Sequence, residues 1–232
     1  MSVSVRFKFS RKGPVRYTGH LDMLRYFQKA VMRSGLPARY SEGFHPHQIM
    51  SFAYPLGVSM ETEGDYMDLD LTQEMGEEEM TERLNAVMNE GIKVSRATVL
   101  KENAQNAMAL VAAADYRISI NGGTDKVRAA VDELMAKEEI LIDGGETKRG
   151  KKKKDPKNIR QGILDMKVLE DGSVFMRLLS GSGFNVRPAD VFDKLNEAAC
   201  GGISTDCICR LEIYASVDDR LIPLSEADKK DA

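Results

Sequence analysis

Two kinds of hydrophobic spacing alternate along this chain, and the order in which they occur repeats once. Residues 3–9 alternate apolar and polar side chains, which indicates a half-buried strand. Residues 19–34 instead place Leu24, Phe27 and Val31 on one stripe of a helix. Further elements are expected as strands at 49–54, 65–71 and 92–100 and as a helix at 76–90. The first half therefore has the order strand, helix, strand, strand, helix, strand.

The second half of the chain follows the same order with one extra strand. Strands are expected at 116–120, 138–143, 163–170, 173–180 and 207–215, and helices at 124–137 and from Pro188 onward. The hairpin between the third and fourth of these strands would turn at Asp171-Gly172, a dipeptide typical of two-residue turns.

This repeated order predicts an α+β protein made of two ferredoxin-like (βαββαβ) halves in tandem. Each half would have a mainly antiparallel sheet with its helices on one face. We expect the halves at 1–103 and 112–222, followed by a polar, frayed tail at 223–232. A single mixed sheet is the alternative fold.

The composition indicates an ordinary soluble globular protein, with 42% hydrophobic and 30% charged residues. No apolar run approaches the roughly 18 residues of a membrane span, and the N-terminus alternates where a signal peptide would be continuously apolar. We therefore expect a cytoplasmic protein without membrane contact. Cys207 and Cys209 would share the buried side of a strand, and Cys200 stands alone. We expect neither a bound metal nor a cofactor.

Charge is strongly polarised along the first ninety residues. Residues 1–50 contain nine Lys/Arg against two carboxylates, whereas residues 61–90 contain eleven Asp/Glu against one Arg. All three histidines lie in the basic segment. A basic surface that also carries imidazoles suggests an anionic ligand, and RNA is the first candidate.

A mixture of cations, aromatic rings and imidazoles in this basic segment suits phosphates and unstacked bases. We expect these side chains to form one pocket: Arg16, Tyr17, His20, Arg39, Tyr40, Phe44, His45 and His47. The alternative for His20 is a capping and packing role at the start of its helix. The spacing of His45 and His47 would also allow a metal, but a third ligand would have to come from a distant part of the chain.

A second basic surface is expected in the second half. Residues 148–160 hold eight Lys/Arg, and Arg187 follows a Gly/Ser-rich turn that leads into a helix. Its expected phosphate-binding members are Lys151, Lys152, Lys153, Lys154, Arg160 and Arg187. The alternatives are a solvated loop at 144–160 and a plain strand-to-helix connection at 181–188.

The open face of the first predicted sheet is a less suitable RNA platform. In a ferredoxin-like half the first and third strands are neighbours, so Arg6 and Lys8 would share that face with Tyr66, Asp68 and Asp70. Their charges would largely cancel. We therefore expect this face to meet a partner or another domain, and RNA to bind through loops.

Two segments carry a resemblance to a known family: GHLDMLRYFQKAVMRSGLPARYSEGFHPHQIMSFAYPLGVSMETEGDYMDLDL at 19–71 and GSGFNVRPADVF at 181–192. They resemble the radical-SAM-linked protein family, whose members occur alone or fused behind a radical S-adenosylmethionine (SAM) domain. The resemblance implies a radical SAM enzyme as partner and gives no catalytic residues. Three cysteines without the cluster motif make this chain look like the free-standing accessory form.

The sequence thus predicts a non-catalytic accessory that binds RNA or presents a substrate to a radical SAM enzyme. One alternative is a metal-independent endoribonuclease that uses His20 or His45 as general acid or base. The other is a protein–protein adaptor without nucleic acid, in which the acidic segment 61–90 docks a basic partner.

Overall fold

The structure is a computed structural model that describes residues 2–143 and 155–230. It divides the chain into two compact units, Met1–Ala114 with Cys209–Ala232, and Asp115–Ile208. The first unit is therefore discontinuous in sequence, because the C-terminal residues belong to it. This division differs from the expected halves, which assigned residues up to 222 to the second half. The fold is mixed, with few helices and a large, mainly antiparallel sheet.

In the first unit, β1 lies between β4 and β3 and is antiparallel to both. The short strand β2 pairs with the other side of β3, and part of β10 pairs in parallel with the start of β3. The strands are β1 (Val3–Arg11), β2 (Met50–Phe52), β3 (Glu61–Leu71), β4 (Ile92–Val99), β10 (Ser204–Val217) and β11 (Arg220–Pro223). Of these strands, β11 was not predicted from the sequence.

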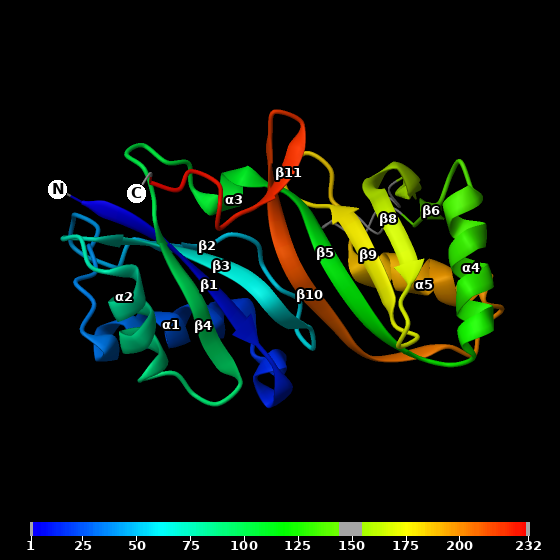
Figure 1. Cartoon of the computed structure of the whole chain (residues 1–232), viewed down its shortest axis with the longest axis horizontal. Coiled ribbons are helices and arrows are strands. Elements are labelled where there is room, and N and C mark those ends of the chain that lie inside the picture. The colour runs from blue at the N-terminus through cyan, green and yellow to red at the C-terminus, as the bar shows by residue number, and fades with distance from the viewer. Residues whose placement is uncertain (1, 144–154, 231–232) are drawn as a thin grey trace. The chain divides into compact units, whose positions relative to one another are not determined.

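The two long helices of the first unit, α1 (His20–Ser34) and α2 (Glu77–Asn85), lie on one face of its sheet (Figure 1). The short element η1 (Gly13–Tyr17) follows β1. The one-turn helix α3 (Ala107–Leu110) belongs to the other face, where the Ala107 amide bonds to the Asp68 carboxylate at 2.7 Å. Helix α1 ends at Gly35, whose φ of 68° is a left-handed conformation that glycine adopts without strain. Phe27 of α1 packs 4.8 Å from Phe9 and 5.4 Å from Phe52, between ring centroids. This aromatic contact fixes α1 against β1 and β2.

On the opposite face of this sheet, polar side chains are hydrogen-bonded to one another. Arg6 donates two bonds to the Asp68 carboxylate, at 2.8 and 3.0 Å, as the expected pairing of β1 with β3 requires. Lys8 donates to Glu212 at 2.6 Å, and so does the Tyr66 hydroxyl at 2.5 Å. Burial and the Glu212 carboxylate raise the pKa of Tyr66. The expected neutralisation is confirmed for Arg6 with Asp68, whereas Lys8 is paired with Glu212 of β10 and not with Asp68 or Asp70.

The C-terminal segment covers this polar face and is not a frayed tail over its described residues. Arg6 donates to the backbone oxygens of Leu224 and Ala227 at 3.0 and 3.2 Å. Leu224 is fully buried, and the Lys230 amide bonds to the Val99 carbonyl at 3.0 Å. The composition of the tail is polar, but its residues Leu224, Ser225 and Ala227 are buried.

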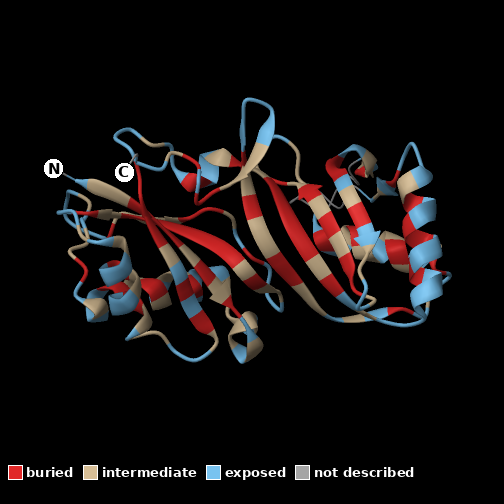
Figure 2. Cartoon of the chain, in the orientation of Figure 1, coloured by how far each residue is buried: buried red, intermediate tan, exposed pale blue. Residues whose placement is uncertain are grey.

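In the second unit, the strand order is β10-β5-β9-β8, and β9 is antiparallel to β8. Gly172, with φ of 79°, forms the expected turn between these two strands. The elements are β5 (Val111–Asn121), α4 (Thr124–Ala136), β6 (Leu141–Ile142), β7 (Lys157–Asn158), η2 (Arg160–Gly162), β8 (Ile163–Val168), β9 (Val174–Leu179) and α5 (Pro188–Ala198). Buried residues follow the strands, and exposed ones the outer sides of the helices (Figure 2).

Among the described residues, no helix is long and apolar enough to cross a bilayer. Cys209 is buried, Cys207 is half-buried and Cys200 is exposed. The described part of the chain also contains no group of three or more His, Cys, Asp or Glu side chains arranged to hold a metal ion.

Candidate nucleic-acid interface

The eight side chains expected in one pocket lie in two groups at opposite ends of β3. Arg16 sits 3.6 Å from Glu61, the first residue of β3. Arg39 sits 3.8 Å from the Asp70 carboxylate, and its amide bonds to the Asp70 carbonyl at 2.8 Å. Nine residues of extended strand separate the two carboxylates, a distance of roughly 30 Å. The expected single pocket is therefore two separate places, because β3 is long.

The first group is Arg16, Tyr17 and His20. The Arg16 guanidinium lies 5.0 Å from the centre of the Tyr17 ring and donates to its hydroxyl at 3.0 Å. His20 is the first residue of α1, and its ring meets that of Phe52 edge-on at 5.7 Å. These contacts fit the packing alternative for His20, which its position at the start of α1 also suggests.

A small cavity beneath His20 is lined by structural charges. Its volume is about 20 Å³, which is room for one water molecule. Arg11, only 2% exposed, donates to the carbonyls of Thr18, Gly57 and Met60 and so ties two loops together. Burial lowers the pKa of Arg11. Asp65, on the cavity wall, accepts a bond from the buried Arg210 at 2.7 Å. Such a small cavity excludes a nucleotide.

The second group is Arg39, Tyr40, Phe44, His45 and His47, which all lie on one loop. Backbone bonds close its base, from the Ser41 amide to the His47 carbonyl at 2.8 Å and from Ile49 to Arg39 at 2.9 Å. The Ser41 hydroxyl lies 2.9 Å from Nδ1 of His47. Above this base the side chains are exposed, and Phe44 is exposed as fully as in an extended peptide, at 101%.

The loop is fixed to α1 through Gln48. This side chain is 5% exposed, and its Nε2 donates to the Gln28 carbonyl of α1 at 3.2 Å and to the Tyr40 hydroxyl at 3.4 Å. Tyr40 therefore stands beside the middle turn of α1. These bonds place the loop beside one flank of α1, next to the exposed side of that helix.

That side of α1 carries three cations that the sequence analysis did not single out. Arg25, Lys29 and Arg33 follow one another at intervals of four residues, which is about 6 Å of helix rise per step. Arg25 is 71% exposed at 3.4 Å from an equally exposed Asp22, and Arg33 donates to the Val87 carbonyl. Lys29 has no ion-pair partner within residues 2–143 and 155–230. These cations could have been recognised from the sequence, because they are spaced by four residues on the polar side of a predicted helix.

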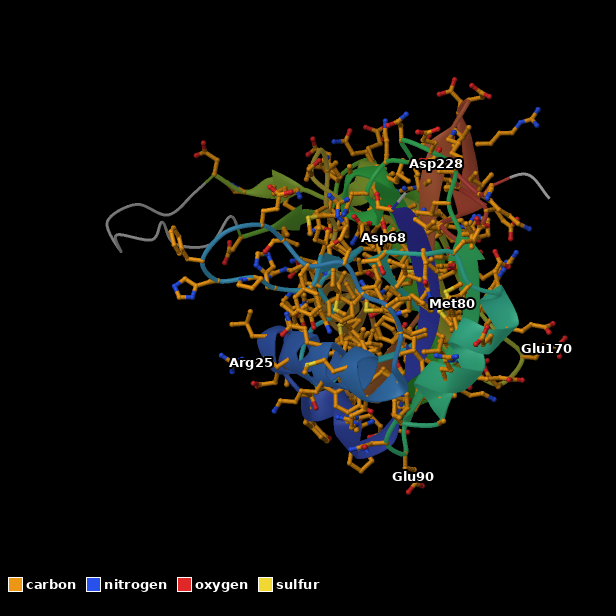
Figure 3. The ribbon with its side chains drawn as sticks, turned by 90° about the vertical axis from the view of Figure 1, so that its left-hand side faces the viewer. Arg25, Asp68, Met80, Glu90, Glu170 and Asp228 are labelled. Carbon is orange, nitrogen blue, oxygen red and sulfur yellow. The ribbon has the colours of Figure 1, made fainter. Side chains whose placement is uncertain are left out.

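Figure 3 shows Arg25 pointing away from α1, on the side where the loop projects, while Asp68 lies inside the unit. We call this the α1–loop surface and define it by its members: Arg25, Lys29, Arg33, Arg39, Tyr40, Phe44, His45 and His47. Chemically it offers a row of cations for phosphates beside aromatic and imidazole rings for bases.

In the second unit, Arg160 and Arg187 make internal contacts. Arg160 donates to the Met135 and Lys137 carbonyls at the end of α4, at 2.9 and 3.1 Å, and to the Ile163 carbonyl of β8 at 3.2 Å. Arg187 donates twice to the Asp190 carboxylate, at 2.6 and 2.9 Å, and these bonds raise the pKa of Arg187. Lys151, Lys152, Lys153 and Lys154 lie outside the described residues.

The Gly/Ser-rich turn before α5 has a packing role. The Lys157 ammonium lies 4.3 Å from the centre of the Phe184 ring and donates to the Asn185 carbonyl at 2.6 Å. A Cβ atom on Gly162 would collide with Phe184 and Val186. The carboxylate of Asp190 already lies in the first turn of α5, where a phosphate would have to bind.

A search of curated proteins finds no match to this chain. A family described as "Uncharacterized protein conserved in bacteria (DUF2344)" matches residues 4–188, which is well over half of the sequence and includes the whole α1–loop surface. The chain therefore belongs to this bacterial family.

Proposed function

We propose that this protein is a non-catalytic accessory that binds RNA and presents it to a radical SAM enzyme in RNA modification. The observation that carries the RNA part is the α1–loop surface, where cations and exposed rings from two segments lie together. The radical SAM partner is supported by the sequence resemblance alone. A cytoplasmic location and a fold of two ferredoxin-like units are parts of the same proposal.

The cations of α1 suit the RNA backbone. They repeat once per turn along one side of the helix, so each is able to face a different phosphate. The loop adds Tyr40 and Phe44, whose rings offer stacking surfaces for bases. Acidic side chains are few here, and Asp22 is a weak competitor because its ion pair with Arg25 is exposed.

A binding role is favoured over a catalytic one by the surroundings of His20. The nearest buried charges, Arg11, Asp65 and Arg210, are engaged in bonds that hold loops in place. The cavity between them has no room for a nucleotide. The ferredoxin-like fold is supported by the strand orders β4-β1-β3-β2 and β10-β5-β9-β8, which follow the same pattern in each unit.

The test is filter binding of a structured RNA by the full chain over a series of salt concentrations. We expect an affinity that falls steeply with salt, because each phosphate contact releases counterions. The double variant Arg25→Ala/Lys29→Ala should lower both the affinity and its salt dependence. The control Lys93→Ala removes an exposed lysine of β4 and should leave both unchanged.

The same samples test the catalytic alternative when the RNA is analysed on a gel. The proposal expects intact RNA after prolonged incubation without metal. Absence of binding at low salt would end the RNA proposal, and cleavage lost in His20→Ala would replace it with the ribonuclease alternative.

A further inference from the structure

We infer that the α1–loop surface recognises unpaired RNA, with the phosphates along α1 and one base stacked on Phe44. This inference rests on the proposed function and deepens it, since RNA binding alone does not distinguish a single strand from a duplex. It follows from the exposure of Phe44, the bracing of its loop, the arrangement of charge, and the covering of the sheet face.

Phe44 is the side chain that most needs an explanation on this surface. Its 101% exposure leaves the whole ring in water, whereas other large apolar residues of the first unit reach 66% at most. Against residues 2–143 and 155–230, therefore, this ring buries none of its surface. Stacking on a base would cover it, and only a base outside a duplex presents a free face.

The loop is braced below this ring. The Ser41 amide, the Ser41 hydroxyl and the Gln48 amide each bond across the base of the loop or to α1. Pro46 and Gly43, with φ of 110°, shape the tip between these fixed ends. A platform that is held before the ligand arrives loses less conformational entropy on binding.

Charge separates a phosphate side from a base side. Arg25, Lys29 and Arg33 lie on α1, while the tip of the loop carries the carboxylate of Glu42 two residues before Phe44. A phosphate is repelled from Glu42 and attracted to α1. A base, which is uncharged and carries N–H donors, is compatible with a carboxylate beside the ring. The expected path of the strand is along α1, with a base turned toward the tip.

The sheet of the first unit offers no competing platform among its described residues. Its polar face is covered by the segment from Leu224 to Lys230, and the guanidinium of Arg6 beneath it has five hydrogen bonds. The other face is covered by α1 and α2. Base stacking in this unit therefore depends on the loop.

The experiment compares a twelve-nucleotide single-stranded RNA with a duplex of the same sequence, by fluorescence anisotropy with the full chain over a salt series. We expect the single strand to bind at least tenfold more tightly than the duplex. Phe44→Ala should weaken single-strand binding about tenfold, within the range known for base–aromatic stacking. Lys29→Ala should reduce the slope of log affinity against log salt by about 0.7, the value for one phosphate of a single strand.

Controls and outcomes separate this inference from the function on which it rests. Val58→Ala, which removes another exposed apolar side chain of the first unit, should leave binding unchanged. Equal affinity for single strand and duplex, with no effect of Phe44→Ala, would overturn the single-strand inference but keep RNA binding if Lys29→Ala still acts. Absence of binding to either RNA would overturn both. The proposed division of roles would be supported if Phe44→Ala weakens single-strand binding without changing the salt slope, and if Lys29→Ala lowers the salt slope.

Discussion

The two faces of the first unit use the same residue types in opposite ways. On the sheet, Arg6 is 1% exposed, and its guanidinium donates hydrogen bonds to the Asp68 carboxylate and to three backbone carbonyls. On α1, Arg25 is 71% exposed, and its one ion pair within the described part of the chain is with Asp22, which is 68% exposed. An arginine that is buried among carbonyls and a carboxylate holds a fold together, whereas one that water can reach is available to a ligand.

Arg6 and Arg25 differ in exposure because a segment of the chain covers the sheet face but not the outer side of α1. The C-terminal segment returns across the sheet and supplies the carbonyls of Leu224 and Ala227 to Arg6. No described segment crosses the outer side of α1: the loop at 39–48 meets one flank of the helix and the residues after α2 meet the other. Charge by itself is therefore a poor guide to a binding surface, and the covering of a side chain is a better one.

The largest expected effect is on the buried side of the comparison. Arg6→Ala removes the cation paired with Asp68 and the donor of three backbone carbonyls, which should lower the free energy of unfolding by about 3–5 kcal/mol. Lys29→Ala should change it by less than about 0.5 kcal/mol. Urea unfolding of the two variants measures both values. Similar losses in the two would show that the faces do not differ as described.

Alkaline pH should destabilise the sheet face next. The pKa of Tyr66 is raised in the folded protein by burial and by Glu212, so the folded state keeps a proton that the unfolded state loses. Stability from this group is complete below the ordinary tyrosine pKa of about 10 and falls above it, by about 1.4 kcal/mol for each pH unit. The difference in stability between the wild type and Tyr66→Phe, measured from pH 9 to 11, should shrink as pH rises. A constant difference would argue against the raised pKa.

A smaller loss of stability is expected when Arg160, which bonds to the C-terminal end of α4, is replaced. Arg160→Ala leaves two carbonyls at the end of α4 and the Ile163 carbonyl of β8 without this donor, and should cost about 1–2 kcal/mol of stability. Thermal unfolding measures the loss. Arg128→Ala, an exposed position on α4, is the matched control and should be close to neutral. An equal loss of stability in both variants would contradict the structural role of Arg160.

The smallest effect concerns the end of the C-terminal segment in acid. Burial works to raise the pKa of Asp228, but the bonds from Lys101 and the Gln105 amide outweigh it and leave the pKa lowered. The stabilisation is present above the unfolded pKa of about 4 and is lost as pH falls through the lower folded pKa. Hydrogen exchange at the Lys101 and Lys230 amides, which bond between the end of β4 and this segment, should therefore quicken below pH 4, and less so in Asp228→Asn. Exchange that is independent of pH after correction for the intrinsic rate would contradict this.

The order of strands and helices was predictable because each element carries its own hydrophobic period. The expected pairing of Arg6 with Asp68 follows from placing the first and third strands side by side, and the structure confirms it. The return of the C-terminal segment was not predictable, because its polar composition hides a buried Leu224. Nor was the division of the long β10 between two units.

The members of the proposed α1–loop surface were predicted only in part, because residues that are close in the sequence are far apart in the fold. Sequence proximity suggested that Arg16 and Arg39 would meet, but their partners lie at opposite ends of β3. The contact of Gln48 with Gln28, which places the loop beside α1, depends on tertiary packing that no local pattern encodes. The separate roles of Arg160 and Arg187 likewise depend on carbonyls and a carboxylate that only the folded chain brings to them.

The most direct test of the central claim is to map where an RNA strand contacts the protein, by backbone amide NMR shifts during titration with the twelve-nucleotide single strand. The account predicts shifts that concentrate in residues 25–33 of α1 and 39–48 of the loop, with little change on the sheet face around Arg6. Shifts confined to the Arg16–His20 end, to the sheet face or to the second unit would contradict it.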